Sequence, residues 1–286
     1  MNATDAGSRS QGSWTDGVWT AETRWPGQTS RAYDLSVRIE EGMTQHAAHP
    51  PFSYRLVKKH GDHVYPKGIS AAMELMSMPG HCGTHVDSLG HIALNGCVFD
   101  GQRVEDVQSE EGGLAVGTVE ELPPLVGPGH LVDGEVLFGR ELTNRDGFGA
   151  DELERWFADR PAPEPGSIVL FRTGLMRHWA DRDRYLGTGV GLPGLSLSGA
   201  RWLSERGVRA VGGDTASFEH KPEWTVPALD VHVHLLVEAR IPIMESVYLE
   251  GLAADRVFDG FFFVAAPLPI KGGTGSPIRP LAFVSG

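Results

Sequence analysis

The stretch PGHCGTHVDSLGHIALNG (residues 79–96) concentrates potential metal ligands within a short span of the chain. His81, His85, Asp87 and His91 stand at offsets of 0, +4, +6 and +10, which are all even. Residues at even offsets share one face of an extended chain, so these four side chains project to the same side. A straight strand would spread them over about 33 Å, whereas each ligand of an ion lies about 2 Å from it. We therefore predict that the segment bends.

Glycines stand where such a bend costs little. Gly83 and Gly90 interrupt the segment, and glycine alone adopts positive φ freely; Gly80 permits a sharp entry after the preceding proline. Two imidazoles and a carboxylate are the ligand set of a catalytic zinc or manganese site, in which three protein donors leave a position open for water. The alternative is a hydrogen-bonded cluster of polar loop residues. Three of the twelve histidines in phase with an aspartate favour the metal site, and Cys82, at an odd offset, is expected to be buried rather than to bind the ion.

A second group of candidates lies in DVHVHLLVEARIPIMES (residues 230–246). Glu245 ends an apolar strand, and a buried carboxylate is costly unless it is paired or binds a cation, which makes Glu245 a candidate ligand. The alternative for Glu245 is an ion pair with a nearby arginine. His232 and His234 flank the start of an apolar helix, and at most one of them is expected to face the site.

Other polar and aromatic residues offer weaker indications. The tract VGGDTAS (residues 211–217) follows a strand and places Asp214 and Thr215 either near the site or in a turn. Phe52 and Trp224 are predicted to contact the substrate, with core packing as the alternative for each. Tyr54 and Phe218 are further candidates to line the pocket, with the same alternative.

Composition excludes several classes of protein. With 286 residues, 41% hydrophobic and 22% charged, the chain is neither fibrous nor wholly disordered. Its net charge of -12 argues against nucleic acid as a partner. The most apolar stretch, residues 260–270, is about half the length of a membrane-spanning helix and holds two prolines, so no membrane span is expected. Two cysteines cannot form a disulfide framework, and the N-terminus does not resemble an export signal, which predicts a cytoplasmic protein.

Short apolar segments alternate with helical patterns along most of the chain. Strands are predicted within residues 32–39, 69–78, 167–172, 210–213, 241–245, 260–266 and 280–284. Helices are predicted over residues 151–158 and from a cap at Ser198 to a stop at Gly207. Strands interleaved with helices indicate an α/β domain. Residues 1–28, rich in Ser, Thr and Gly with three tryptophans, suggest an N-terminal arm.

The sequence HCGTHVDSLGH resembles the HxGTHxDxPxH signature of the metal-dependent cyclase family, which includes bacterial kynurenine formamidase and isatin hydrolase. Leu89 replaces the proline of that signature. Further similarity follows in the family's order in PGSIVLFRTG (residues 165–174), LSLSGARWLSERGVRAVGGDTAS (residues 195–217) and HVHLLVEARIPIMES (residues 232–246). The resemblance covers about residues 30–270.

The resemblance implies a single-domain swivelling β/β/α fold with a mixed sheet and irregular loops, assembled as a homodimer or homotetramer. It divides the chain into the arm (residues 1–28) and a cyclase-like, metal-dependent hydrolase domain (residues 29–286). One or two divalent ions, Zn²⁺ or Mn²⁺, are implied, with ligands matching His81, His85, Asp87, His232 and Glu245. His91 matches a residue that acts as a catalytic acid or base, or binds a second ion.

The predicted function is hydrolysis of a small amide, lactam or ester. A water activated by the ion attacks the carbonyl, and His91 carries the proton to the leaving group. Three alternatives use the same residues: a metal-dependent lyase, dehydratase or cyclase, a metal-dependent binding protein without catalysis, and a metal that only stabilises the fold. No GxSxG elbow, phosphate-binding loop or dinucleotide fingerprint competes with this interpretation.

Overall fold

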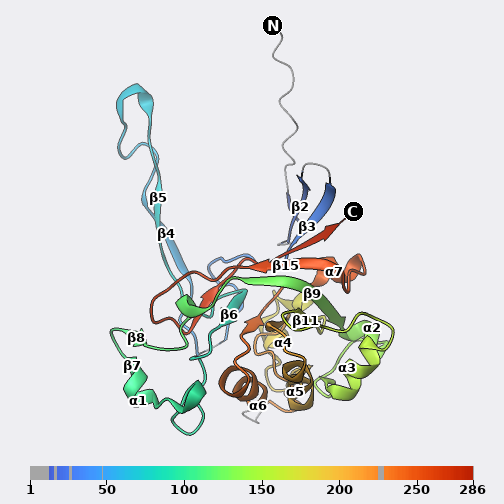
Figure 1. Cartoon of the computed structure of the whole chain (residues 1–286). Coiled ribbons are helices and arrows are strands. Elements are labelled where there is room, and N and C mark those ends of the chain that lie inside the picture. Colours follow the sequence, from blue (N-terminus) through green and yellow to red (C-terminus); the bar gives the residue numbers. More distant parts are fainter. Residues whose placement is uncertain (1–12, 16–17, 26–27, 47, 225–228, 286) are drawn as a thin grey trace.

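A large mixed sheet forms the centre of the computed structural model, which describes residues 13–15, 18–25, 28–46, 48–224 and 229–285 (Figure 1). Eleven strands of the described chain pair in this sheet. In spatial order they are β1 (Ser13–Thr15), β2 (Val18–Trp25), β3 (Gln28–Asp34), β17 (Leu281–Ser285), β15 (Phe261–Ala265), β9 (Leu125–Asp133), β11 (Ile168–Arg172), β13 (Ala210–Gly213), β14 (Ile243–Glu245), β6 (His85–Asp87) and β16 (Gly275–Pro277).

The middle of the sheet is parallel. Strands β9, β11, β13 and β14 run in one direction, and every other pairing in the sheet is antiparallel. The segments between the parallel strands contain α2 (Gly134–Phe138), α3 (Ala150–Phe157), η4 (Leu175–His178), α4 (Arg182–Leu186), α5 (Leu197–Glu205), α6 (Asp230–His232) and the π-helical η5 (Val233–Glu238). In Figure 1, α2, α3, α5 and α6 lie below the sheet. The predicted α/β class is confirmed.

The remaining elements are short and lie outside this sheet. Three strand pairs stand apart: β4 (Ser53–Lys58) with β5 (Met73–Ser77), β7 (Gln108–Ser109) with β8 (Gly113–Leu114), and β10 (Gly147–Phe148) with β12 (Gly194–Leu195). The other helical turns are η1 (Pro66–Gly68), η2 (Phe99–Gly101), α1 (Val104–Val107), η3 (Val119–Glu121) and α7 (Glu250–Ala254). Figure 1 shows the β4–β5 hairpin extending away from the body of the molecule.

Both faces of the parallel strands are buried, which explains their continuous apolar sequences. In β11, Val169 and Phe171 pack in the core that the helices cover, whereas Ile168 and Leu170 pack in the core on the opposite face. The same alternation continues in β14, where Ile243 belongs to the helix-side core and Met244 to the other. Side chains in phase with Ile243 therefore face the helices.

Each of the seven segments predicted as strands overlaps a strand, although in residues 32–39 the strand ends at Asp34, and both predicted helices are present. The helix of residues 197–205 is capped by Ser196 rather than by Ser198, because the Ser196 hydroxyl accepts the bond from the Gly199 amide. Strands β1 and β2 lie within the segment predicted as an arm and extend the sheet beyond β3. Among the described residues, none of the helices has the length and apolar character needed to cross a membrane.

Candidate metal centre

The register of three antiparallel strands places two carboxylates and a histidine on one face. Glu245 at the end of β14 stands directly opposite His85 in β6, and Asp87 stands opposite Ile243. Directly opposite residues share a face, with Cβ atoms about 4.5–5.5 Å apart. Nε2 of His85 accordingly lies 3.4 Å from Oδ1 of Asp87 and 3.6 Å from Oε2 of Glu245. All three residues are buried on the helix side of the sheet.

His81 reaches this group from the loop before β6. Its Nδ1 lies 2.7 Å from Oδ1 of Asp87, and its Nε2 lies 3.0 Å from the hydroxyl of Thr274. Gly275, opposite Asp87 in β16, leaves room for the ring: a Cβ at this position would lie 2.7 Å from Cε1 of His81 and 2.8 Å from the carbonyl oxygen of Val86. The position of His81 therefore depends on a glycine almost 200 residues away in sequence.

The predicted bend of the segment is present, but its two glycines act differently. Gly83 has φ +58, as a left-handed turn before β6 requires. Gly90 has no positive φ; a Cβ there would lie 2.5 Å from the Leu114 side chain and 2.9 Å from a carbonyl oxygen, so close packing demands this glycine. The turn after Asp87, closed by a bond from the His91 amide to the Ser88 carbonyl, returns the chain toward the site.

That turn places the His91 ring 4.1 Å from the His81 ring, centroid to centroid. Burial lowers the pKa of His91 to about 4, because the nearby histidines add to the cost of charging it and outweigh the attraction of Asp87. His91 is thus a neutral imidazole near neutral pH, able to accept a proton.

His232 enters the group from α6. The Glu219 carboxylate accepts bonds from both the backbone amide and Nδ1 of His232, at 2.8 and 2.9 Å, and so orients the ring. Its Nε2 lies 3.3 Å from Oε1 of Glu245 and 3.7 Å from Oδ2 of Asp87. His234 instead contacts Ser204 and Glu238, away from the site.

Two sets of three donors meet at Asp87: His81, His85 and Asp87 form one, and Asp87, His232 and Glu245 form the other. The donor atoms within each set lie within 4.8 Å of one another. Donors about 2.0–2.2 Å from a common ion are at most about 4.4 Å apart, so small shifts bring either set into coordination. The buried carboxylates of Asp87 and Glu245 are surrounded by imidazoles, which suits a divalent cation.

The same carboxylates govern protonation of the cluster. Burial would lower the pKa of His85 and His232, but Asp87 and Glu245, with Glu219 for His232, raise these pKa values to about 9 and about 10. Burial would raise the pKa of Asp87, but bonds with His81 and His85 hold it well below its usual value.

The other candidates lie outside this cluster. Phe52 is buried and lines a neighbouring cavity with His46 and His49, and these two histidines also border the cluster at His81. Trp224 lines a separate surface cavity with Asn144 and Arg145, so its role stays a prediction.

Residues 214 and 82 take structural roles. Asp214 accepts bonds from the Thr173 amide and hydroxyl and from the Gly174 amide, which fixes a turn. Cys82 is fully buried, and burial raises its pKa to about 11.

Sequence reasoning missed Glu219, Thr274 and Gly275. Glu219 forms an isolated bridge with Leu195, next to a second bridge between Lys221 and Leu192, and belongs to no strand. Thr274 and Gly275 follow a glycine-rich loop that carries no ligand-type side chain. Pairing of β16 with β6 would identify Thr274 and Gly275, and the contact with His232 would identify Glu219; a single sequence reveals neither.

The chain matches the family model described as "Putative cyclase" over residues 33–220. This match spans more than half of the chain, which therefore belongs to the putative cyclase family. The predicted family is confirmed.

Curated relatives and solved structures agree with this family assignment. Kynurenine formamidase from Bacillus anthracis is 26% identical over 258 residues, covering 88% of this chain and 97% of the relative. A crystal structure of a novel cyclase superposes with a TM-score of 0.80 at 25% identity, covering 89% of each chain. Isatin hydrolase A from Ralstonia solanacearum superposes with a TM-score of 0.70 at 24% identity, covering 89% of this chain and 92% of the other. The predicted cyclase-family fold is confirmed.

Substitution of Gly275 by alanine tests how the site is built. The added Cβ overlaps the His81 ring and the Val86 carbonyl oxygen, so we expect Gly275→Ala to weaken binding of Zn²⁺ or Mn²⁺ at least tenfold. Gly251→Ala is the control, because its Cβ would meet only Tyr33, at 3.4 Å. Competition with a chromophoric chelator measures both affinities; unchanged affinity in Gly275→Ala would refute the packing argument.

Metal binding is expected to release protons. His85 and His232, with raised pKa values of about 9 and about 10, are protonated in the metal-free protein near neutral pH, and an ion must displace those protons. Affinity should rise about tenfold per pH unit for each displaced proton until pH passes 9 to 10. Calorimetric titration in two buffers of different ionisation enthalpy counts the protons, and a count of zero contradicts the expectation.

Proposed function

We propose that this protein is a metal-dependent hydrolase of a small amide, cyclic amide or ester. The observation that carries the proposal is the pair of three-donor sets sharing Asp87, with a neutral imidazole, His91, in ring contact with His81. The names of the relatives, kynurenine formamidase and isatin hydrolase, support an acyclic formamide or a cyclic amide as substrate.

His81, His85 and Asp87 would hold one divalent ion, and His232 and Glu245, with Asp87, complete its shell or hold a second. We propose Zn²⁺ or Mn²⁺ on the basis of the nitrogen and oxygen donors. When bound, such an ion supplies Lewis-acid polarisation of a carbonyl oxygen and acidifies a coordinated water. Glu219 fixes the tautomer of His232 so that Nε2 faces the carboxylates.

His91 has the properties of a proton carrier. Its ring adjoins the donor sets, and its low pKa leaves one ring nitrogen unprotonated; we propose that this nitrogen accepts a proton from attacking water and, as a strong acid once protonated, delivers it to the leaving nitrogen or oxygen. Phe52, in the cavity beside His49, is the proposed aromatic contact for substrate. We further propose a cytoplasmic homodimer or homotetramer.

Isotope labelling tests the reaction type. Protein loaded with Zn²⁺ or Mn²⁺ is incubated with N-formyl arylamines, isatin and small lactones in ¹⁸O-labelled water. We expect one labelled oxygen in the carboxylate product, because hydrolysis takes that oxygen from water. A product without the label would identify a lyase or cyclase, and ligand-induced stabilisation without any product would identify a binding protein.

Replacement of His91 separates proton transfer from metal binding. We expect His91→Gln to retain the ion and to lower kcat about 10²–10⁴-fold, because only the proton carrier is lost. His234→Ala is the matched control, since this histidine faces Ser204 and Glu238 rather than the site. Elemental analysis and steady-state kinetics are the measurements; full activity in His91→Gln would exclude the proposed role.

A further inference from the structure

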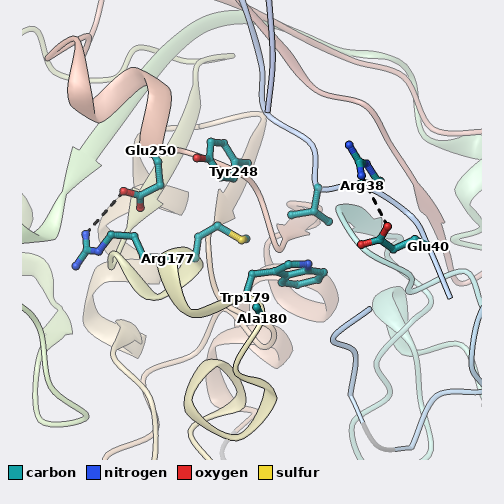
Figure 2. Close-up of a pocket in the computed structure, with 9 residues that line it drawn as sticks. Arg38, Glu40, Arg177, Trp179, Ala180, Tyr248 and Glu250 are labelled. Carbon is teal, nitrogen blue, oxygen red and sulfur yellow. Dashed lines mark ion pairs between the residues drawn. The ribbon is translucent and has the colours of Figure 1, made fainter. Parts of the chain in front are cut away.

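A second cavity lies at the carboxyl ends of two parallel strands (Figure 2). Its volume is about 450 Å³, within the range of roughly 300–1,000 Å³ that is typical of small-molecule sites. Met176 and Trp179 line it from the segment that follows β11, and Tyr248 and Glu250 line it from the segment that follows β14. Ligands of α/β sheets commonly bind in the crevice outside the carboxyl ends of the strands. We call this space the Trp179 cavity.

The Trp179 cavity is separate from the space at the metal centre. The cavity that His81 and His85 border has a volume of about 20 Å³, and in the described part of the chain it shares no lining residue with the Trp179 cavity. Trp179 lines one of the two spaces and Tyr185 lines the other, and their rings meet edge to face with centroids 5.0 Å apart. The function proposed for the metal centre therefore leaves the Trp179 cavity unused.

The middle of the Trp179 cavity is apolar and preformed. Figure 2 shows the ring of Tyr248 on one side and the ring of Trp179 on the other. Val37 and Met176, both buried, add aliphatic and thioether surface. The Thr44 hydroxyl donates to the backbone carbonyl of Trp179 at 2.6 Å and fixes that residue from outside the cavity. A wall that is already ordered keeps the entropic cost of binding low.

An ion pair stands at each end of the cavity (Figure 2). Nη1 of Arg177 lies 3.7 Å from Oε2 of Glu250 at one end, and Nη1 of Arg38 lies 3.9 Å from Oε2 of Glu40 at the other. The side chains of Arg38 and Glu40 are more than half exposed, whereas that of Glu250 is 16% exposed. Glu250 is therefore the charged group that water screens least, and it is where a ligand charge would be recognised most strongly.

Glu250 is held in place and can still accept hydrogen bonds. Nε and Nη2 of Arg172 donate to its two carboxylate oxygens at 2.9 and 2.8 Å. A carboxylate offers about four acceptor positions, and these bonds use one on each oxygen. In Figure 2 the hydroxyl of Tyr248 points toward this end of the cavity. An ammonium group placed here would donate to Glu250 beside an aromatic ring.

The charges around this end favour a cation. Arg172 and Arg177 lie within 3.7 Å of three carboxylates, those of Asp133, Glu135 and Glu250. Two positive and three negative charges leave a net charge of −1 in this group, and the ion pair at the other end of the cavity is neutral overall. The group therefore attracts an ammonium ion and repels a carboxylate. The aromatic faces that line the cavity add a cation–π attraction.

We propose that the Trp179 cavity binds a small organic cation, with its ammonium group at Glu250 and its apolar or aromatic body between Tyr248 and Trp179. Such a molecule matches both the charged end and the apolar middle of the cavity. A metal ion would leave the apolar walls uncovered, and a neutral apolar molecule would leave the excess negative charge without a partner. The proposal does not rest on the metal centre, because none of these residues belongs to it.

Calorimetric titration with 2-phenylethylammonium tests the site. We expect saturable binding of one molecule per chain, with a Kd on the order of 1 mM or tighter for a ligand of this size. 2-Phenylethanol and 3-phenylpropanoate keep the aromatic body but replace the ammonium with a neutral and an anionic group, and each should bind roughly tenfold more weakly or worse. No saturable binding of the ammonium probe, or equal binding of either matched probe, overturns the proposal.

Two variants locate the bound cation. Glu250→Gln removes the charge at the proposed contact and should weaken binding roughly tenfold or more. Ala180→Arg adds a positive charge and volume at an exposed position that lines the cavity, and should weaken binding to the same degree without touching the bonds of Arg172. Ala162→Arg is the matched control, because it makes the same change at an exposed position ahead of β11, on the amino side of that strand.

The remaining outcomes are also decisive. If Glu250→Gln fails to fold by circular dichroism, Ala180→Arg decides the question. Equal affinity in Ala180→Arg and Ala162→Arg, or full affinity in a folded Glu250→Gln variant, overturns the site. Loading the protein with Zn²⁺ should leave the affinity unchanged, and binding seen only after loading would place the amine at the metal centre instead. Because none of these measurements uses turnover, failure of the hydrolase proposal would leave them interpretable.

Discussion

The pairing register of β14, β6 and β16 is the constraint on which the candidate site depends. Val86 and Met244 are fully buried in the core away from the helices, and this fixes His85, Asp87 and Glu245 on the opposite face. A slip of one residue would bury two carboxylates and a histidine in an apolar core and expose Val86 to the polar site. The free energy of core packing therefore maintains the positions of His85, Asp87 and Glu245, whereas His81 and His232 are held by Thr274 and Glu219.

This arrangement concentrates opposite charges in a buried region. Asp87, Glu219 and Glu245 are all buried, and their electrostatic partners in the cluster are histidines, whose charge depends on pH. A buried carboxylate without compensation is costly, so the cluster either takes up protons on His85 and His232 or receives a cation. A divalent ion would supply that compensation to either donor set, and Asp87 has one oxygen near each set. Burial of these carboxylates thus lowers the stability of the folded protein, and the same carboxylates favour binding of a cation.

The sequence was sufficient to predict the parts of the site that are contiguous. Even spacing identified His81, His85, Asp87 and His91 as a group, and apolar runs located the strands, because side-chain periodicity is a local property. Contacts between segments that are distant in sequence are not local, so Glu219, Thr274 and Gly275 gave no signal. The same limit applies to the β4–β5 hairpin. The segment that forms β5 was predicted as a strand, but its pairing with β4 and the projection of the hairpin from the body are not local properties of either segment.

Leu89 shows how the turn after Asp87 forms without the proline of the family signature. The amide of Gly90 donates to the Gly117 carbonyl at 2.8 Å, and the amide of His91 donates to the Ser88 carbonyl at 3.0 Å. Leu89 itself packs against the helix-side core. A proline would restrict φ at this position, whereas here two hydrogen bonds and an apolar contact hold the turn. His91 is therefore positioned by tertiary packing around Gly90, and the departure from the signature leaves its ring beside that of His81.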